Sequence, residues 1–349
     1  AGHAQLAEHV LPNFSPASQY GRLVTSLHMA IGFGITTVVE PQNSLDDLGH
    51  FEHARDEGKL RSRLIAALFH PRGTAAEELD GFADAKRRFD DDRFRVAPIK
   101  LYIDDVLEPH TAAMLEPYAD APETRGDTFY PPEEFAAVIT DLERRDFQTF
   151  THATGDRGIR TALDAIQTAR ERNGPGDRRH QLVHVECVHP DDLSRFAELR
   201  VVACMQPRHA APDIVDVWRR AAGPQREGTA FPWRSLQASG ATLAFSSDWN
   251  VAEMDPLVGI YTAVTRADLR GENAWATQET VDLETAIRAY TMGSAYANFA
   301  EGDRGSISPG KHADLVALSQ NLFEIEPAGF LETRADLVMT GGEIHLRRF

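Results

Sequence analysis

The stretch VAPIKLYIDD at residues 96–105 decides the fold that this sequence predicts. It is an apolar run that turns polar at its C-terminal end, and Lys100 lies inside it. Buried parallel strands read as short apolar runs, and (β/α) barrels place their functional side chains at the C-terminal strand ends. Three more runs of this kind are FQTFTHATGD (147–156), QLVHVEC (181–187) and ATLAFSSDWN (241–250), which carry His152, His184 and Asp248. Together they predict a barrel with four polar side chains at one rim.

The rest of the chain up to residue 301 alternates between strand-like and helix-like pieces. The clearest amphipathic helix is predicted at residues 156–172, and another helix, at residues 20–34, precedes the first strand. An open doubly wound sheet is the alternative, but the G-x-G-x-x-G phosphate loop typical of such sheets does not occur. We therefore predict an α/β fold, a (β/α)8 TIM-type barrel that lacks its first strand. The seven predicted strands are residues 35–40, 63–69, 96–103, 147–154, 180–188, 200–206 and 241–247.

The C-terminal residues 302–349 follow a different pattern. GSISPGKHADLVALS and ADLVMTGGEIHLRRF read as strand, turn and strand, with Gly341 and Gly342 at a hairpin turn. We predict two units, a barrel at residues 1–301 and a small β appendage at residues 302–349.

Composition excludes several classes of function. The 349 residues are 42% hydrophobic, which is enough to bury a core, and the formal charge is −17. Nucleic-acid and anionic-membrane surfaces need clustered Lys and Arg, so we expect neither partner. Cys187 and Cys204 lie in predicted strands and are expected to be buried free thiols, which favours a cytoplasmic protein. No run is apolar enough to span a bilayer, and a homo-oligomer is compatible with the sequence.

The polar side chains at the predicted rim are of the kinds that bind metal ions. Neutral imidazoles and carboxylates are zinc ligands, although the spacing of these residues matches no local metal motif. Each also has a structural interpretation: a strand-end His can be structural, Lys100 can be ion-paired and Asp248 can cap a loop. Three other residues at predicted strand ends, assigned to substrate binding, are Asp104, Asp156 and His209.

The sequence resembles the amidohydrolase superfamily, and within it the YtcJ-like branch. The resemblance runs in family order over essentially the whole chain, and the last of the segments that carry it is a strong superfamily signature. These segments are GFGITTVVE (32–40), VAPIKLYIDDVLEPHTAAMLEPYAD (96–120), THATGDRGI (151–159), QLVHVECVHPDDL (181–193), CMQPRHA (204–210), FSSDWNVAEMDPL (245–257), AYTMGSAYA (289–297) and GSISPGKHADLVAL (305–318).

This resemblance implies a barrel beside a small β-sandwich, with one or two divalent metals, usually zinc. It implies that Lys100 is carboxylated and bridges the metals, that His152 and His184 bind one of them, and that Asp248 binds the other and acts as general base. Such a lysine is plausible chemically because burial lowers the pKa of a lysine readily. The family's H-x-H ligand pair does not occur in this sequence. We expect that pair and the first strand to lie upstream of Ala1, so that this chain alone binds metal weakly and hydrolyses little.

Three functional hypotheses follow. The first is a metal-dependent hydrolase of amide-type C–N bonds in a small molecule, such as an N-substituted formamide or a cyclic amide. The second keeps the fold and hydrolyses an ester, a phosphoester or an aryl C–N bond. The third is a non-catalytic protein that uses the barrel mouth for binding. We expect the two long loops, residues 105–130 and 207–232, to select the substrate.

Overall fold

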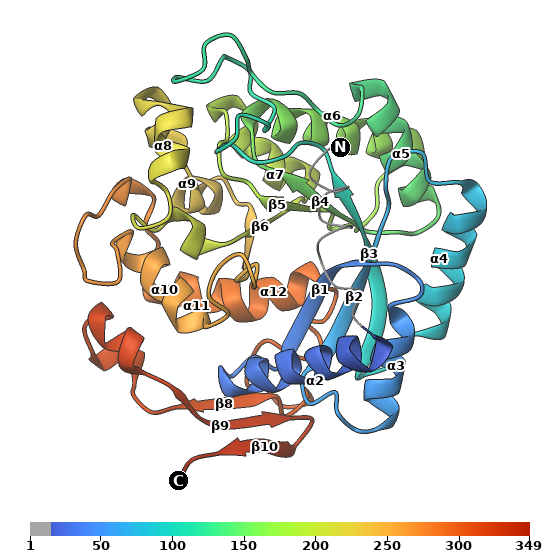
Figure 1. The fold of residues 1–349 in the computed structure, drawn as a ribbon, viewed down its shortest axis with the longest axis vertical. Coiled ribbons are helices and arrows are strands. Elements are labelled where there is room, and N and C mark those ends of the chain that lie inside the picture. Colours follow the sequence, from blue (N-terminus) through green and yellow to red (C-terminus); the bar gives the residue numbers. More distant parts are fainter. Residues whose placement is uncertain (1–14) are drawn as a thin grey trace.

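The computed structural model describes residues 15–349, so the first 14 residues of the predicted barrel unit lie outside the described part. Seven parallel strands form one curled sheet in the order β1-β2-β3-β4-β5-β6-β7, with helices along its outer face (Figure 1). This confirms the predicted barrel-type α/β fold and its seven strands. The strands are β1 (Thr37–Asn43), β2 (Arg63–Phe69), β3 (Phe94–Tyr102), β4 (Thr149–Ala153), β5 (Gln181–His184), β6 (Val202–Met205) and β7 (Thr242–Phe245).

Strands β2 to β7 are mostly buried, whereas β1, at an edge of the sheet, is mostly of intermediate burial. In β2 every residue except the last is buried, as expected for a parallel strand enclosed on both faces. Within the described residues, β1 and β7 each pair with one strand only, so the curled sheet is open between them.

The helices alternate with the strands along the chain. Helix α6 (Asp156–Asn173) agrees with the prediction, since Ile159, Leu163 and Ile166 form a buried stripe. An acidic residue in its first turn and arginines in its last turn complement the helix dipole. The other helices of this part are α2 (Pro16–Gly32), α3 (Leu48–Asp56), α4 (Ala76–Arg88), α5 (Pro132–Arg144), α7 (Leu193–Leu199), α8 (Asp216–Ala222), α9 (Trp233–Ala238) and α10 (Pro256–Thr265).

The last helix predicted from the sequence, residues 283–299, is interrupted. It consists of α11 (Leu283–Arg288), a π-helical turn at Ala289–Gly293 and α12 (Ser294–Ala297). A side chain at Gly293 would collide with the backbone oxygen of Leu243 in β7, because a Cβ there would lie 2.0 Å away. The widened turn therefore coincides with a close approach between this helix and the sheet.

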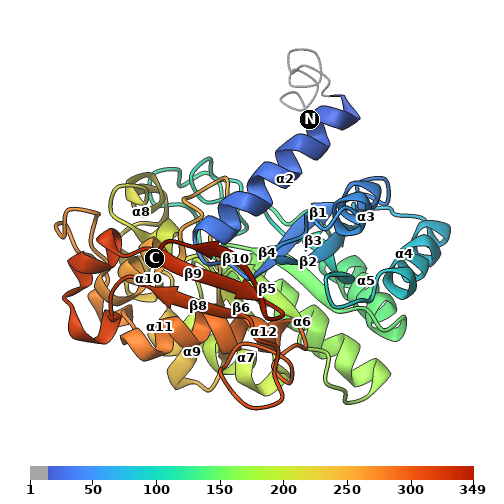
Figure 2. The same cartoon turned by 90° about the horizontal axis from the view of Figure 1, so that it is seen from below.

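The C-terminal residues form a separate antiparallel sheet of β8 (Leu315–Leu318), β9 (Ala335–Thr340) and β10 (Glu343–Arg347). Gly341 and Gly342 join β9 to β10 with φ values of 59° and 85°, which is the backbone that a tight hairpin turn requires. The hairpin prediction is therefore confirmed. This sheet lies beside α2, as Figures 1 and 2 show, and Ile31 of α2 packs into the same cluster as Ala335 and Val338.

Both cysteines are buried and free, as predicted. Among residues 15–349 no helix combines the length and the apolar character needed to cross a bilayer.

Candidate metal centre

The C-terminal ends of neighbouring strands bring the predicted ligands together. Register aligns Tyr102 of β3 with His152 of β4, and Ala153 of β4 with His184 of β5. His209 lies in the 3-10 turn Pro207–Ala210 that follows β6, and Asp248 follows β7 by three residues. Consecutive strands thus deliver one polar group each to the same rim, which is the arrangement that the apolar runs predicted.

The rings and the carboxylate at this rim are close neighbours. The ring centroids of His152 and His184 are 4.5 Å apart, and those of His184 and His209 are 5.9 Å apart in a stacked arrangement. His209 Nε2 lies 3.6 Å from Asp248 Oδ2. One ligand atom from each of His184, His209 and Asp248 lies within 4.8 Å of the other two. These three residues, two of them predicted as metal ligands and His209 predicted to bind substrate, form the tightest set of donor atoms.

The backbone turns sharply where the ligands emerge. His184 has φ 78°, Val185 has φ 54° and Asp248 has φ 58°. The left-handed region is unfavourable for side chains with a Cβ, and such residues cluster at functional sites where the surrounding structure holds them. Here the left-handed turns direct His184 and Asp248 toward the same point at the rim.

Burial keeps two of the histidines neutral. It lowers the pKa of His152 to about 3, and Lys100 lowers it in the same direction. Burial, together with His152 and Lys100, also holds the pKa of His184 well below its usual range. A neutral imidazole retains the lone pair that a metal needs. Because His152 Nε2 lies 3.0 Å from the backbone oxygen of Asp105, which can only accept, Nε2 carries the hydrogen and Nδ1 carries the lone pair.

Lys100 is enclosed on the inner side of the sheet. Its Nζ lies 4.4 Å from the ring centroid of Tyr102 and 5.1 Å from that of Phe150. Burial lowers the pKa of Lys100 to about 8, although the Asp248 carboxylate opposes that change. A lysine with this pKa is partly a neutral amine at physiological pH.

His209 and Asp248 influence each other. Burial alone would lower the pKa of His209, but the carboxylates of Glu186 and Asp248 outweigh it and the pKa is raised. Burial likewise raises the pKa of Asp248, while His209 and Lys100 oppose the rise. The Asp248 side chain keeps 30% of its surface exposed, so solvent can reach its carboxylate.

The other two residues predicted to bind substrate, Asp104 and Asp156, lie behind the rim. Asp104 is fully buried; its Oδ1 accepts a hydrogen bond from Thr154 N, and its Oδ2 accepts from Ala113 N and Gly155 N at 2.9–3.0 Å.

Asp156 Oδ1 accepts a hydrogen bond from Leu115 N at 2.6 Å. Both carboxylates therefore anchor the loop at residues 105–130 to the turn that follows β4. Their predicted contact with substrate remains a prediction.

Sequence reasoning missed Glu186, which stands behind His209. Its Oε1 lies 3.7 Å from His209 Nδ1, and its Oε2 accepts a hydrogen bond from Trp218 Nε1 at 3.0 Å. The available signal was a carboxylate inside the otherwise apolar run VHVECV, two residues after His184. A buried acidic residue in such a run needs a partner, and here the partners come from distant parts of the chain.

A curled parallel sheet with polar groups at its C-terminal rim is the architecture of a TIM-type barrel. Residues 1–345 match the family described as "Amidohydrolase family". The chain therefore belongs to the amidohydrolase family.

Three similar proteins illustrate this relationship. "Protein LONG AFTER FAR-RED 3" of Arabidopsis thaliana is 33% identical over 65% of this chain and 39% of its own length. "Putative amidohydrolase YtcJ" of Bacillus subtilis (strain 168) is 30% identical over 80% of this chain and 51% of its own length. The crystal structure of an uncharacterized metal-dependent hydrolase from Pyrococcus furiosus matches with a TM-score of 0.73 at 25% identity, covering 89% of this chain and 61% of that one. The chain thus spans about half or less of the length of these two sequence relatives.

Proposed function

We propose that this protein hydrolyses amide-type C–N bonds in a small molecule with the help of a bound divalent metal, with zinc as the expected ion. The observation that carries the proposal is the convergence of His184, His209 and Asp248 donor atoms within 4.8 Å at the C-terminal rim. The buried Nε2 of His209 has no hydrogen-bond partner, so the donor set fits a metal ion. Membership of the amidohydrolase family supports the same reaction class.

The family resemblance assigns the metal or metals to Lys100, His152, His184 and Asp248, of which His184 and Asp248 belong to the convergent set of donor atoms. A divalent ion in such a site lowers the pKa of a water molecule toward ~7 and polarises the substrate carbonyl. His152 would offer Nδ1, since its Nε2 already donates to Asp105 O.

Lys100 would act as a carbamate. The ammonium group first loses one proton, and the neutral amine then forms an N–C bond to carbon dioxide and releases a second proton, so that a cation becomes an anion with two oxygen ligands. A pKa near 8 and an enclosed position among aromatic rings support this step.

Asp248 is the proposed general base. Its carboxylate is partly exposed at the rim and would accept a proton from the attacking water, then pass it to the leaving nitrogen. Burial raises the pKa of Asp248, so its carboxylate holds the accepted proton more readily than an aspartate in water would.

The long loops at residues 105–130 and 207–232 are proposed to select the substrate, because both follow strands that end at the rim. A cytoplasmic location belongs to the same proposal and is supported by the two buried free thiols.

Matched substrates test the proposal. The chain is assayed, with added Zn²⁺ and bicarbonate, against an N-substituted formamide and the formate ester of the same group. Metal-dependent cleavage of the amide supports the proposal. Cleavage of the ester alone favours the second hydrolase hypothesis. Cleavage of neither, with the metal bound and the family's H-x-H pair supplied, favours a binding protein.

A further inference from the structure

We propose that His209 is a metal ligand and that Glu186 is the residue that positions it, so that His184, His209 and Asp248 hold one divalent ion through three protein ligands. This inference rests on the proposed metal dependence but assigns His209 a different role from the substrate contact predicted from the sequence. It also adds Glu186, which no strand-end pattern had indicated.

One ring nitrogen at the rim has no hydrogen-bond partner. His209 Nε2 is buried and makes no hydrogen bond, although the histidine side chain is 12% exposed as a whole. Its neighbour Asp248 Oδ2 lies 3.6 Å away, beyond hydrogen-bond distance. Two ligands ~2.1 Å from a tetrahedral zinc ion are about 3.4 Å apart. The separation of these two atoms therefore suits joint coordination better than a direct contact.

A carboxylate lies behind the His209 ring. A ligating histidine usually directs its other ring nitrogen to a carboxylate, which fixes the tautomer and the ring orientation. Glu186 Oε1 lies 3.7 Å from His209 Nδ1, which is within ion-pair range but longer than a hydrogen bond, and its negative charge favours a hydrogen on Nδ1. Glu186 is itself held by Trp218, whose indole N–H donates to its Oε2 at 3.0 Å, and the Glu186 residue is only 7% exposed. Nδ1 thus faces an acceptor, which leaves the lone pair on Nε2, toward Asp248 and His184.

Three protein ligands converge at this point of the rim. His184 and His209 stack with an interplanar angle of 11°, and their donor atoms and that of Asp248 lie within 4.8 Å of one another. Three protein ligands with a fourth position left for water is the pattern of catalytic zinc sites, whereas structural sites use four. The three residues come from β5 and from the segments that follow β6 and β7. This set of ligands therefore includes no residue from β1.

The test measures metal binding instead of turnover. The chain is stripped of metal and titrated with Co²⁺, whose visible absorption reports coordination. His209→Ala is expected to weaken binding by about 100-fold or more, and His209→Gln, which keeps most of the side-chain volume, should do the same.

Glu186→Gln is the sharper variant, with an expected loss of about 10- to 100-fold. The glutamine oxygen can still accept from Trp218, but its NH₂ group would then face His209 Nδ1. That donor forces Nδ1 to accept and places the hydrogen on Nε2, where the metal should bind.

A matched control exists elsewhere in the chain. Glu143 and His180 form another buried Glu–His pair, with Oε2 and Nε2 3.4 Å apart, on the segments that lead into β4 and β5. Glu143→Gln removes the same kind of contact away from the rim and should leave Co²⁺ affinity within threefold of the parent chain. Urea unfolding of every variant separates loss of ligation from loss of fold.

The outcomes separate this inference from the proposed function. If His209→Ala keeps the parent affinity while Lys100→Met and His152→Ala lose it, the assignment of His209 is wrong and the proposed hydrolase stands. If the parent chain takes up no Co²⁺, the three-ligand site is wrong, and the proposed function fails with it only if metal-stimulated hydrolysis is absent as well.

Discussion

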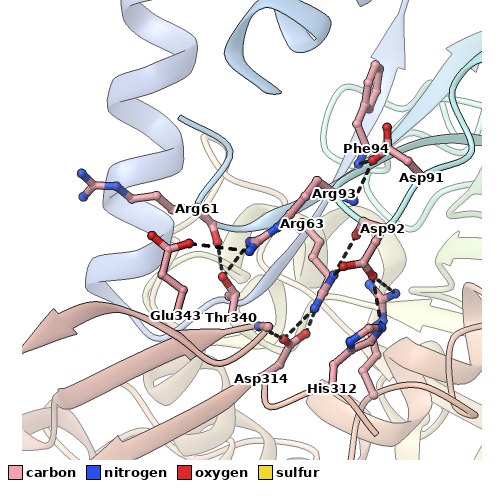
Figure 3. A network of polar contacts seen from close by, with 12 residues as sticks. Arg61, Arg63, Asp91, Asp92, Arg93, Phe94, His312, Asp314, Thr340 and Glu343 are labelled. Carbon is pink, nitrogen blue, oxygen red and sulfur yellow. Dashed lines mark hydrogen bonds and ion pairs between the residues drawn. The ribbon is translucent and has the colours of Figure 1, made fainter. Parts of the chain in front are cut away.

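Arg63 at the start of β2 donates two hydrogen bonds to the carboxylate of Asp314, which lies 251 positions later in the chain, at 2.7 and 2.9 Å. Both side chains are buried, with 1% and 5% of their surface exposed. Figure 3 shows this pair at the centre of a polar network that also contains Asp92 and His312. The pair therefore connects the curled sheet to the segment that begins the C-terminal sheet.

Asp314→Asn should destabilise the protein by about 3 kcal/mol, because removing one partner of a buried ion pair leaves the other charge without compensation. Asp92 also pairs with Arg63, and this places the expected loss at the lower end of the usual range. Urea unfolding measures the change. Asp336→Asn is the control, since its partner Arg334 is 60% exposed and such pairs contribute at most about 1 kcal/mol. Equal losses in the two variants would show that Arg63 and Asp314 do not stabilise the fold as a buried pair.

The same pair predicts how stability depends on pH. Burial raises the pKa of Asp314, but its hydrogen bonds from Arg63 and Gly341 N outweigh that effect, and the pKa is lowered overall. The pKa of Asp92 is lowered in the same way by Arg63.

A lowered folded-state pKa means that the unfolded chain binds protons first as the pH falls. The stabilisation is therefore complete above the ordinary aspartate pKa of about 4 and is lost as the pH falls through the lowered value. The free energy of unfolding, measured with urea between pH 6 and pH 3, should fall less steeply with decreasing pH in Asp314→Asn than in the parent chain. The same pH dependence of the unfolding free energy in the two proteins would show that Asp314 does not have a lowered pKa in the folded state.

Asp104→Asn should loosen the loop at residues 105–130. The two carboxylate oxygens accept three backbone hydrogen bonds, and an asparagine would place an NH₂ group against at least one of these N–H donors. The expected cost is about 1–3 kcal/mol. Hydrogen exchange at Ala113 and Gly155 should accelerate.

A control for this variant lies in the same loop. Asp127, whose side chain is 95% exposed, should tolerate Asp127→Asn without change in exchange. Gly158→Ala offers a second route to the same effect, because a Cβ there would lie 2.3 Å from Asp104 Oδ2. Unchanged exchange protection at Ala113 and Gly155 in both Asp104→Asn and Gly158→Ala would rule out Asp104 as the residue that anchors the loop.

Much of the fold could be predicted because parallel strands enclosed on both faces leave an unmistakable sequence pattern. The runs around Lys100, His152, His184 and Asp248 were short, apolar and closed by polar residues, and each became a strand that ends at the rim. The hairpin at Gly341 could be predicted for a different reason, since two consecutive glycines supply the positive φ values of a tight turn.

Two elements were missed for identifiable physical reasons. Helix α10 (Pro256–Thr265) was not predicted, although Asp255 caps it by accepting from Leu257 N and Pro256 occupies its first turn. Its apolar residues are spread around the helix instead of along one stripe, because it is buried, so the period of an amphipathic helix is weak.

The π-helical turn before Ser294 depends on its contact with β7, which no local pattern encodes.

The site was only half accessible from the sequence. Strand ends identify residues that reach the rim, but they do not say which atoms face each other there. Glu186 and Trp218 are 32 positions apart, and only the fold brings the indole N–H to the carboxylate. Asp104 shows the opposite case, a strand-end carboxylate whose oxygens are directed at the backbone and away from the rim.

In a protein that also carries the family's H-x-H pair, Asp248→Asn should abolish turnover while leaving the fold largely intact. The carboxamide cannot accept a proton from the attacking water, and general base catalysis contributes about 10²- to 10⁴-fold to such reactions. The measurement is the rate of amide hydrolysis at saturating metal, because the asparagine also weakens a proposed ligand.

Asp255→Asn is the control in the same loop, since Asp255 caps α10 by accepting from Leu257 N at 2.9 Å and is not one of the three donor residues at the rim. It should lower stability by about 1 kcal/mol or less and leave the rate close to that of the parent chain. Turnover of Asp248→Asn within a few-fold of the parent rate would remove Asp248 from the role of general base.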